Sequence, residues 1–289
     1  LNLEGDPTLE DWSQVRQNRS SRPRGPQTGR ILICTPSNFA ADEVLARLVR
    51  DTNIDHRYIT RIYARSIEAA HGSLYKGGLH IDARTDHRIR TGLEEHSLHF
   101  KTRNRPNLKV MLNQLPRDGG GRATIQRDFD RRYENEEADV IKNSRIVVST
   151  CSSACSHSSL VKDLGDSGRK ARFRTVIVDE AAQATELDVV LPALAAEQRV
   201  VLVGDHKQLG PVVPETNLCT AFLGALETPM LERLYKSPEL LPANTMLDRQ
   251  YRMDPSIRIF PSKQFYGSRL EDDESIVGHS LPPCVWPNP

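Results

Sequence analysis

The chain has 289 residues and a formal net charge of +1; 38% of its residues are hydrophobic and 27% are charged, as in an ordinary globular protein. No apolar run approaches the ~18–20 residues of a membrane helix and no signal peptide is evident, so we expect no membrane partner. The odd number and irregular spacing of the cysteines argue against a disulfide framework. We therefore expect a reducing compartment, the cytoplasm, with the nucleus as the alternative.

Both ends of the chain are expected to be cuts in a longer protein. The sequence begins with Leu1 rather than Met, and residues 282–289 are rich in proline, as in a loop. Residues 1–29 are polar and contain several arginines, so we predict a flexible segment there.

The first regular elements are predicted from residue 30 onwards. The apolar run at 31–34, which stops before Pro36, predicts a buried strand. Apolar residues at helical spacing then predict a helix capped by Ser37 or Asn38. A further strand is expected within 58–64.

Residues 66–144 differ from their surroundings in being rich in charged residues and histidine. Together with the glycine run at 119–121, this composition predicts a polar, partly helical, solvent-facing insertion. Its arginines could face nucleic acid. We slightly favour the alternative, a solvated charged face, because acidic residues are interleaved.

From residue 145 the apolar pattern returns in three runs, at 146–150, 175–178 and 200–203, separated by helical stretches such as 187–197. Such β-branched runs suit a parallel sheet buried on both faces, and their alternation with helices predicts a doubly wound α/β fold. Ligands bind beyond the carboxyl ends of the strands in such sheets. The polar residues after each run are therefore the first candidates for a site.

Two adjacent carboxylates follow the run at 175–178. Asp179 could hold Mg²⁺ directly or through water, and Glu180 could orient or deprotonate an attacking water, as in the Walker B arrangement of phosphate-loop ATPases. The alternative is structural, because Asp179 could instead cap a following helix.

Two further segments carry candidate phosphate contacts. In 204–211, Gly204 permits close backbone approach and the Gln208 amide could contact a terminal phosphate or its water. One βαβ crossover separates this segment from Asp179, so the two strands should be parallel and end at the same sheet edge. In 248–255, Arg252 could stabilise charge on a transferring phosphate, and Tyr251 could stack on a base. Ordinary polar turns are the alternative for both segments.

Taken together, these segments resemble the superfamily 1B helicases, in the branch that contains the nonsense-mediated decay RNA helicase and its antiviral and RNA-silencing relatives. Residues 35–42 resemble motif Ia, 149–151 the next nucleic-acid-contacting motif, 179–186 motif II, 204–211 motif III, and 250–255 with 260–266 motif IV. Their order and spacing match over residues 30–270. This agreement is far more specific than any single motif.

The resemblance implies a role for each of these positions, with ATP and Mg²⁺ as cofactors. Asp179 would bind Mg²⁺, Glu180 would activate water, and the residues implied at the chemical step are Asp179, Glu180, Gln208 and Arg252. The residues implied to bind ATP are Gly204, Asp205, Gln250 and Tyr251. The residues implied to touch the backbone of a single strand are Pro36, Ser37, Asn38, Thr150 and Cys151.

The sequence departs from the family pattern in two respects. It contains no Gly-x-x-x-x-Gly-Lys-Ser/Thr, the Walker A loop, and residues 25–30 echo that loop only superficially. The family places this loop shortly upstream of motif Ia, and motifs V and VI in the second motor domain, so all are expected outside the chain. Asp254 stands where the family usually has His.

A second metal site has only weak support in the sequence. Cys151, Cys155 and His157 have ligand-like spacing, so a zinc site is conceivable, but no second ligand cluster lies near in sequence. A Cys/His nucleophile pair has no better support.

The resemblance implies a RecA-like doubly wound parallel sheet. Residues 30–240 would form the first motor domain, with 66–144 as its accessory insertion, and 245–289 would begin the second. The parent protein is predicted to be an ATP-dependent helicase that translocates on and unwinds nucleic acid, with single-stranded RNA as the expected partner and protein partners bound through other regions. The chain alone is expected to be inactive. A catalytically inactive nucleic-acid-binding module and a DNA-directed helicase of the same superfamily remain the alternatives.

Overall fold

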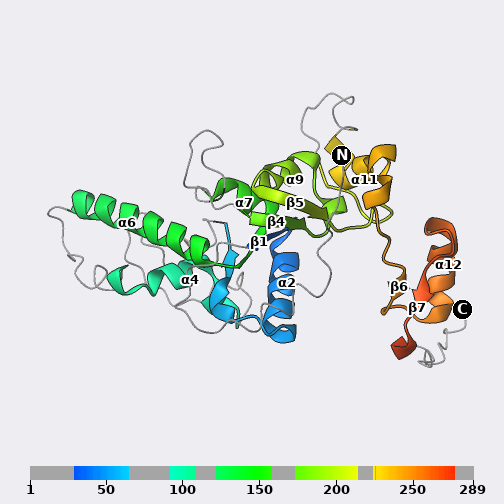
Figure 1. Ribbon diagram of the computed structural model, residues 1–289, viewed down its shortest axis with the longest axis horizontal. Helices are drawn as coiled ribbons and strands as arrows, with labels where there is room; N and C mark the ends of the chain where they lie inside the picture. The colour runs from blue at the N-terminus through cyan, green and yellow to red at the C-terminus, as the bar shows by residue number, and fades with distance from the viewer. Residues whose placement is uncertain are drawn as a thin grey trace, which may run out of the picture. The chain divides into compact units, whose positions relative to one another are not determined.

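The computed structural model describes residues 29–64, 92–108, 122–157, 160, 173–213, 224 and 226–276 (Figure 1). Apart from Gly29, the segment predicted to be flexible lies outside this part of the chain, as do residues 282–289. The described residues form two compact units. The first contains those up to Asp179 together with Leu187–Leu202, and the second contains Glu180–Glu186 and those from Val203 onwards. The predicted division near residues 240–245 stays a prediction.

The first unit is built on a parallel five-stranded sheet in the order β2-β3-β1-β4-β5, which confirms the predicted α/β fold. The strands are β1 (Ile31–Thr35), β2 (Ile59–Ile62), β3 (Ile146–Thr150), β4 (Phe173–Val178) and β5 (Ala196–Leu202). Strands β2 and β3 are buried along their whole length, as expected of a sheet covered on both faces. Strand β5 has no buried residue and Val200 is 41% exposed, so the expectation of burial on both faces is wrong for this strand, which lies at the end of the strand order.

Strand β5 begins earlier than the sequence suggested. Helix α9 (Glu186–Ala193) ends soon after Pro192, and β5 starts at Ala196, so the helix predicted to reach residue 197 is wrong in its last part. The cause is tertiary pairing. Ala196 lies opposite Phe173 of β4, and the Phe173 N–H donates to the Ala195 carbonyl at 3.0 Å. Pairing with a buried strand outweighs the helical preference of this alanine- and glutamate-containing stretch.

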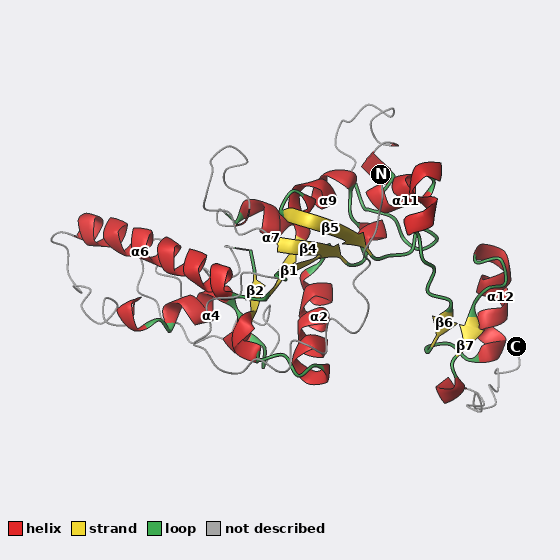
Figure 2. Cartoon of the chain, in the orientation of Figure 1, coloured by secondary structure: helices red, strands yellow, loops and turns green. Residues whose placement is uncertain are grey.

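Helices cover both faces of the sheet. Helix α2 (Asn38–Asp51) lies on one face, and α7 (Cys151–Ser156) and α9 lie on the other (Figure 2). Ser37 is the N-cap of α2, as predicted, because its side chain accepts a hydrogen bond from the Ala40 N–H. Leu45 of α2 packs in a core with Ile33 and Val148, so the helix is fixed against β1 and β3.

The described part of the predicted insertion contains η2 (Glu94–His96), α4 (Leu98–Arg103) and α6 (Arg122–Asn143). Helix α4 packs against α6, and apolar residues of both are buried, among them Leu98, Phe129 and Val140. The insertion therefore has a small core of its own, which its sparse apolar residues did not suggest.

The second unit consists of short elements. They are η3 (Ala181–Gln183), α11 (Met230–Tyr235), η4 (Pro238–Ala243), β6 (Arg249–Gln250), α12 (Pro255–Phe265), β7 (Glu271–Asp272) and η5 (Glu274–Ile276). Asp254 caps α12, because its side chain accepts a hydrogen bond from the Ser256 N–H at 2.8 Å. This capping role accounts for an aspartate at that position. Among the described helices of both units, none is long and apolar enough to cross a membrane.

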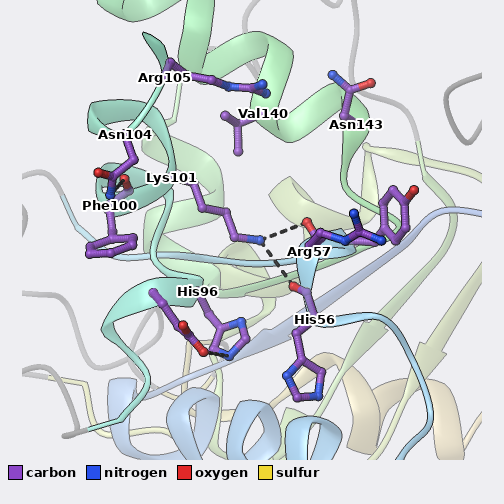
Figure 3. Close-up of a pocket in the computed structure, with 11 residues that line it drawn as sticks. His56, Arg57, His96, Phe100, Lys101, Asn104, Arg105, Val140 and Asn143 are labelled. Atoms are coloured by element: carbon purple, nitrogen blue, oxygen red, sulfur yellow. Dashed lines mark hydrogen bonds and ion pairs between the residues drawn. The ribbon is translucent and has the colours of Figure 1, made fainter. Parts of the chain in front are cut away.

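Lys101 of α4 ties the insertion to the strand β2 region of the first unit. It lies in a cavity of about 440 Å³ lined by η1 (His56–Tyr58), η2, α4 and α6 (Figure 3). Its ammonium group donates to the carbonyls of His56 (3.5 Å), Arg57 (3.1 Å) and Ile59. The two arginines that line the cavity are already paired with carboxylates, Arg57 with Asp55 and Arg105 with Glu136. The cavity thus lies at the junction of these elements. The charges of both lining arginines are compensated by carboxylates, and Lys101 is the central hydrogen-bond donor.

We expect the contribution of Lys101 to folded-state stability to increase in mildly alkaline solution, because deprotonation relieves the burial of its charge. Burial lowers the pKa of Lys101 to about 8 in the folded chain, whereas a lysine in an unfolded chain titrates near about 10.4. Between these values the unfolded state binds more protons, so folded-state stability rises with pH. The melting temperature of the unaltered chain, relative to Lys101→Met, should therefore increase from about pH 7.5 to about pH 9.5. A difference that does not change with pH would contradict this account.

Candidate functional site

Three neighbouring strands of the first unit end at one level of the sheet. In the order β3-β1-β4, Thr35 lies opposite Thr150 and Cys34 lies opposite Val178. The Asp179 N–H continues this pairing by donating to the Cys34 carbonyl at 2.9 Å. The residues after each strand, 36–38, 151 and Asp179, therefore follow consecutive strand ends along one edge. Strand β5 is parallel to β4, with Leu202 opposite Val178, which confirms that these strands also end at the predicted common edge.

The loop after β1 presents polar groups at the start of α2. The Thr35 hydroxyl donates to the Ser37 carbonyl at 2.7 Å and shapes the turn, while the Ser37 side chain caps the helix. Pro36 and Asn38 are half-buried and Ser37 is exposed. Of the predicted strand-contacting residues, these are the ones with side chains at the surface.

The loop after β3 is organised differently. Thr150 caps α7 by accepting a hydrogen bond from the Ser153 N–H at 3.1 Å, and it is only 6% exposed. Cys151 is 1% exposed. Contacts from Thr150 and Cys151 to a nucleic acid would therefore have to come mainly from the backbone.

The cysteines near this edge support neither a zinc site nor a Cys/His nucleophile pair. A hydrogen bond with Cys151, together with burial, raises the pKa of Cys34 well above its ordinary value, and burial raises the pKa of Cys155 to about 11. Metal binding and nucleophilic attack both need the thiolate. Within the described ranges no group of three His, Cys, Asp or Glu side chains could hold a metal ion.

Glu180 begins the second unit with an unusual backbone conformation. Its φ of 54° and ψ of 35° lie in the left-handed region, which a glutamate adopts at a cost of about 1–2 kcal/mol. Glu180, and not Asp179, occupies the N-cap position of η3, and it makes no side-chain capping bond there. The exposed Glu180 carboxylate instead accepts a hydrogen bond from Gln183 Nε2 at 2.9 Å. Such strain is concentrated at functional sites.

Gly204 lies against the backbone of this same turn. A Cβ at position 204 would be 2.9 Å from the Ala182 nitrogen and 3.0 Å from the Ala181 nitrogen. The Ala181 N–H also donates to the Val203 carbonyl at 2.8 Å. The glycine therefore allows the segment after β5 to approach the turn that begins at Glu180.

Asp205 organises the rest of the 204–211 segment. It accepts hydrogen bonds from the Lys207 N–H (2.9 Å), the Gln208 amide (2.8 Å) and the Tyr266 hydroxyl (2.6 Å). Partial burial opposes ionisation, but these hydrogen bonds outweigh it and lower the pKa of Asp205. The ionised Asp205 thus orients the Gln208 amide, and Tyr266 is a partner to which we assigned no role from sequence.

In the segment 250–252, Gln250 holds the turn together by hydrogen bonds, whereas the next two residues are exposed. The Gln250 amide oxygen accepts from the Arg252 and Met253 N–H groups, and its nitrogen donates to the Met253 carbonyl and to Asp272. Its amide atoms are therefore already engaged within the chain. Tyr251 is 63% exposed, and the exposed Arg252 has no ion pair within the described ranges. Both are placed to reach an outside ligand.

The donor set fits the cofactors implied by the sequence in part. Asp179 supplies one half-buried carboxylate oxygen donor at a strand end, which suits Mg²⁺, a cation that usually takes one or two protein carboxylates and completes its shell with phosphate and water. Arg252, which has no ion pair among the described residues, could supply a cation for a phosphate. Asp205 and Gln250 are occupied by hydrogen bonds within the chain, so the direct contacts to ATP expected from them stay predictions.

The parallel sheet, with an acidic pair after β4 and a glutamine-bearing loop after β5, is consistent with the RecA-like class of α/β folds. A family model described as an AAA domain matches residues 8–215, well over half of the chain, and a second model with the same description matches residues 226–288. The chain belongs to this family, in its branch of superfamily 1 helicases that includes the regulators of nonsense transcripts.

The individual relatives agree with this assignment. The chain is 30% identical over 260 residues to "ATP-dependent helicase NAM7" of Saccharomyces cerevisiae, and the match covers 90% of the chain and 23% of the relative. It is 31% identical over 266 residues to "Regulator of nonsense transcripts 1 homolog" of Arabidopsis thaliana, covering 90% of the chain and 18% of the relative. It is 27% identical over 316 residues to "Helicase sen1" of Schizosaccharomyces pombe, covering 93% and 18%. The chain thus spans about a fifth of the length of these curated relatives.

Replacing Gly204 by alanine should separate the two segments that it brings together. The added Cβ would meet backbone nitrogens at 2.9 and 3.0 Å, and backbone cannot move aside as a side chain can, so we expect a destabilisation of about 1–3 kcal/mol. Gly210→Ala, in the same loop, is the matched control, because its Cβ would meet only the Glu227 carbonyl at 3.8 Å. Urea denaturation of both variants tests the contact; equal stability of the two would show that the close approach does not exist in solution.

Proposed function

We propose that the chain forms the strand-contacting and phosphate-sensing part of an ATP-dependent helicase that translocates on single-stranded RNA. The observation that carries the proposal is the alignment of strand ends in β3-β1-β4. It sets the loop that starts at Pro36 directly beside Asp179, the predicted Mg²⁺ ligand. Because β4 pairs directly with β1, no strand separates the phosphate end of β4 from a loop that would touch nucleic acid.

The strand-contacting side would rely on contacts that do not read sequence. Ser37 and Asn38 offer exposed or half-buried polar groups at the start of a helix, whereas Thr150 and Cys151 could contribute mainly backbone groups. Hydroxyl, amide and backbone donors suit phosphate oxygens, which are the same at every nucleotide. This donor set supports movement along a strand rather than recognition of one sequence.

The nucleotide side would divide its tasks among side chains with different surroundings. Asp179 would hold Mg²⁺, which neutralises charge on the phosphates when it is bound. The exposed Glu180 carboxylate would position and deprotonate the attacking water, Gln208 would sense the γ-phosphate, and Arg252 would stabilise charge on it. Relatives of the chain carry "ATP-dependent helicase" in their names, which supports the assignment.

A second candidate function is a nucleic-acid-binding module without ATPase activity. The absence of Gly-x-x-x-x-Gly-Lys-Ser/Thr from the sequence favours it for this chain taken alone, because that loop is the element that cradles the phosphates in phosphate-loop enzymes. A DNA-directed helicase is a third candidate, since the 2′-hydroxyl distinguishes RNA from DNA and no assigned residue reads it.

Comparing RNA and DNA strands in an ATPase assay tests these candidates together. We expect the longer protein that contains this chain to hydrolyse ATP when single-stranded RNA is added, and the 289-residue chain alone to show little hydrolysis. Stimulation by DNA alone would favour the DNA-directed helicase. Strand binding without hydrolysis in the longer protein would establish the inactive module. A robust strand-stimulated rate from the isolated chain would contradict its predicted inactivity.

Neutralising Glu180 should separate nucleotide binding from turnover. In the longer protein, Glu180→Gln keeps a side chain of the same shape but removes the base, so turnover should fall at least about a hundredfold while ATP binding persists. Glu186→Gln is the matched control, because Glu186 lies in the same motif but pairs with Arg233 at 2.6 Å. Rates from steady-state hydrolysis and affinities from a fluorescent ATP analogue would be compared. Unchanged turnover in Glu180→Gln would remove this residue from its assigned role.

A further inference from the structure

A buried arginine lies in the middle of strand β2, behind the loop that starts at Pro36. The Arg61 side chain is 0% exposed and donates from Nε to Asp42 of α2 at 2.8 Å. A second guanidinium nitrogen, Nη2, donates to the side-chain oxygen of Asn38 at 2.9 Å, and the third donates to the Ile62 carbonyl. Arg61 therefore connects β2, the strand at one end of the sheet order, to the first turn of α2.

The surroundings of Arg61 hold its guanidinium group in one orientation. The guanidinium carbon lies 4.0 Å from the centre of the Tyr63 ring, and the Tyr63 hydroxyl donates to the same Asp42 oxygen at 2.9 Å. Burial raises the pKa of Tyr63 above its ordinary value, so this hydroxyl stays protonated and remains a donor. Leaving the Arg61 charge unpaired in the interior would be costly, so the ion pair with Asp42 is retained. This ion pair and the contact with the Tyr63 ring together fix the guanidinium plane.

The backbone of Arg61 is as firmly held as its side chain. Arg61 lies opposite Val148 in the β2–β3 ladder, and on its other side it forms an isolated bridge with Ser97. Ser97 in turn caps α4 of the insertion by accepting from the Phe100 N–H. Arg61 is thus anchored to β3 and to the residue that caps α4, neither of which belongs to the loop of Asn38 that it contacts.

The contact with Arg61 decides which way the Asn38 amide faces. A guanidinium group can only donate hydrogen bonds, so the Asn38 atom that faces it must be the amide oxygen. The amide nitrogen, with its two N–H donors, is then the atom left for other partners, and it has none among the described residues. Asn38 is half-buried at the start of α2, in the loop that we assign to nucleic-acid contact.

We propose that Arg61 is a positioning residue that fixes the Asn38 amide so that its N–H donors meet acceptor oxygens of a bound single strand. The inference rests on the proposed function, since it assumes that this loop contacts a strand. The acceptors are phosphate oxygens, because Asn38 offers donors and the contact is to be the same at each nucleotide. Asp42 and Tyr63 act on the strand only through Arg61.

The alternative for Arg61 is a purely structural role, and the chain contains a matched residue for comparison. Arg30 is also buried, stacks on an aromatic ring with 4.5 Å between its guanidinium carbon and the Phe173 centroid, and donates to the Ser144 carbonyl at 3.0 Å. It precedes β1, so it lies at the opposite end of that strand from the Asn38 loop. Arg30→Lys should lower stability without changing strand affinity, as any buried arginine without a positioning role would.

A double-mutant cycle on strand affinity tests the proposal in the 289-residue chain. Binding of a labelled oligouridine would be followed by fluorescence anisotropy for Arg61→Lys, Asn38→Ala and the double variant, with Arg30→Lys as control. Lysine keeps the charge near Asp42 but cannot bridge to Asn38 in the same plane. We therefore expect Arg61→Lys to weaken binding roughly five- to tenfold, a partial loss of the charge-assisted hydrogen bond between Asn38 and phosphate. In the Asn38→Ala background the same change should have no further effect.

The outcomes of the cycle are distinct. Equal weakening by Arg61→Lys with and without Asn38, or equal weakening by Arg30→Lys, overturns the positioning role. If the unaltered chain binds no strand, the proposed function itself fails. If it binds but Arg61→Lys has no effect, only the present inference fails.

A measurement on the unaltered chain covers the case in which Arg61→Lys does not fold. The side-chain N–H pair of Asn38 can be assigned by nuclear magnetic resonance, because it disappears in Asn38→Asp, where a carboxylate still accepts from Arg61. Addition of oligouridine should shift this pair. A pair that stays unmoved at saturating strand would show that the amide donors do not meet the nucleic acid.

Discussion

The parallel register of β3, β1 and β4 is the constraint on which the rest of the first unit depends. Each parallel pair aligns its carboxyl ends, so Thr150, Thr35 and Val178 stop at one level and their loops emerge together. A shift of one residue would turn each side chain to the other face of the sheet. Because Leu32, Val147 and Val176 are all fully buried, such a shift is strongly disfavoured. The core thereby fixes the spacing of the candidate site.

Within that frame, residues that hold the loops are distinct from residues that remain free for a ligand. Asp205 gathers Gln208 and Tyr266, and Gln250 closes the turn that precedes α12. Among the described residues, the Gln250 amide atoms are fully engaged and Asp205 accepts three hydrogen bonds, whereas Arg252 and the Asn38 amide nitrogen keep donors for a ligand. Residues that belong to the same motif therefore have different physical roles. Some hold a loop in place, and others keep donors for a ligand.

Much of this arrangement could be predicted from the sequence, because β-branched runs and the polar residues after them are local signals. The start of β5 could not, since its first residues become a strand only by pairing with Phe173. The left-handed backbone of Glu180 leaves no mark in the residue type. The pairs Arg61–Asp42 and Tyr266–Asp205 join residues separated by 19 and 61 positions, so no periodicity reveals them. One clue was present: Arg61 lies within the strand predicted at 58–64, and a charged residue must find a partner when such a strand is buried.

The buried pair of Arg61 and Asp42 is not explained by stability alone. Well-packed apolar residues in place of a buried ion pair are often neutral or stabilising, because desolvation offsets the Coulomb attraction. An apolar side chain at position 61 would, however, leave the Asn38 amide free to turn either its oxygen or its nitrogen outward. A phosphate oxygen accepts hydrogen bonds and repels an amide oxygen. Under the proposed positioning role, a fixed donor at Asn38 would suit a contact with phosphate, and a partner that can only donate, such as arginine, sets the orientation of the amide.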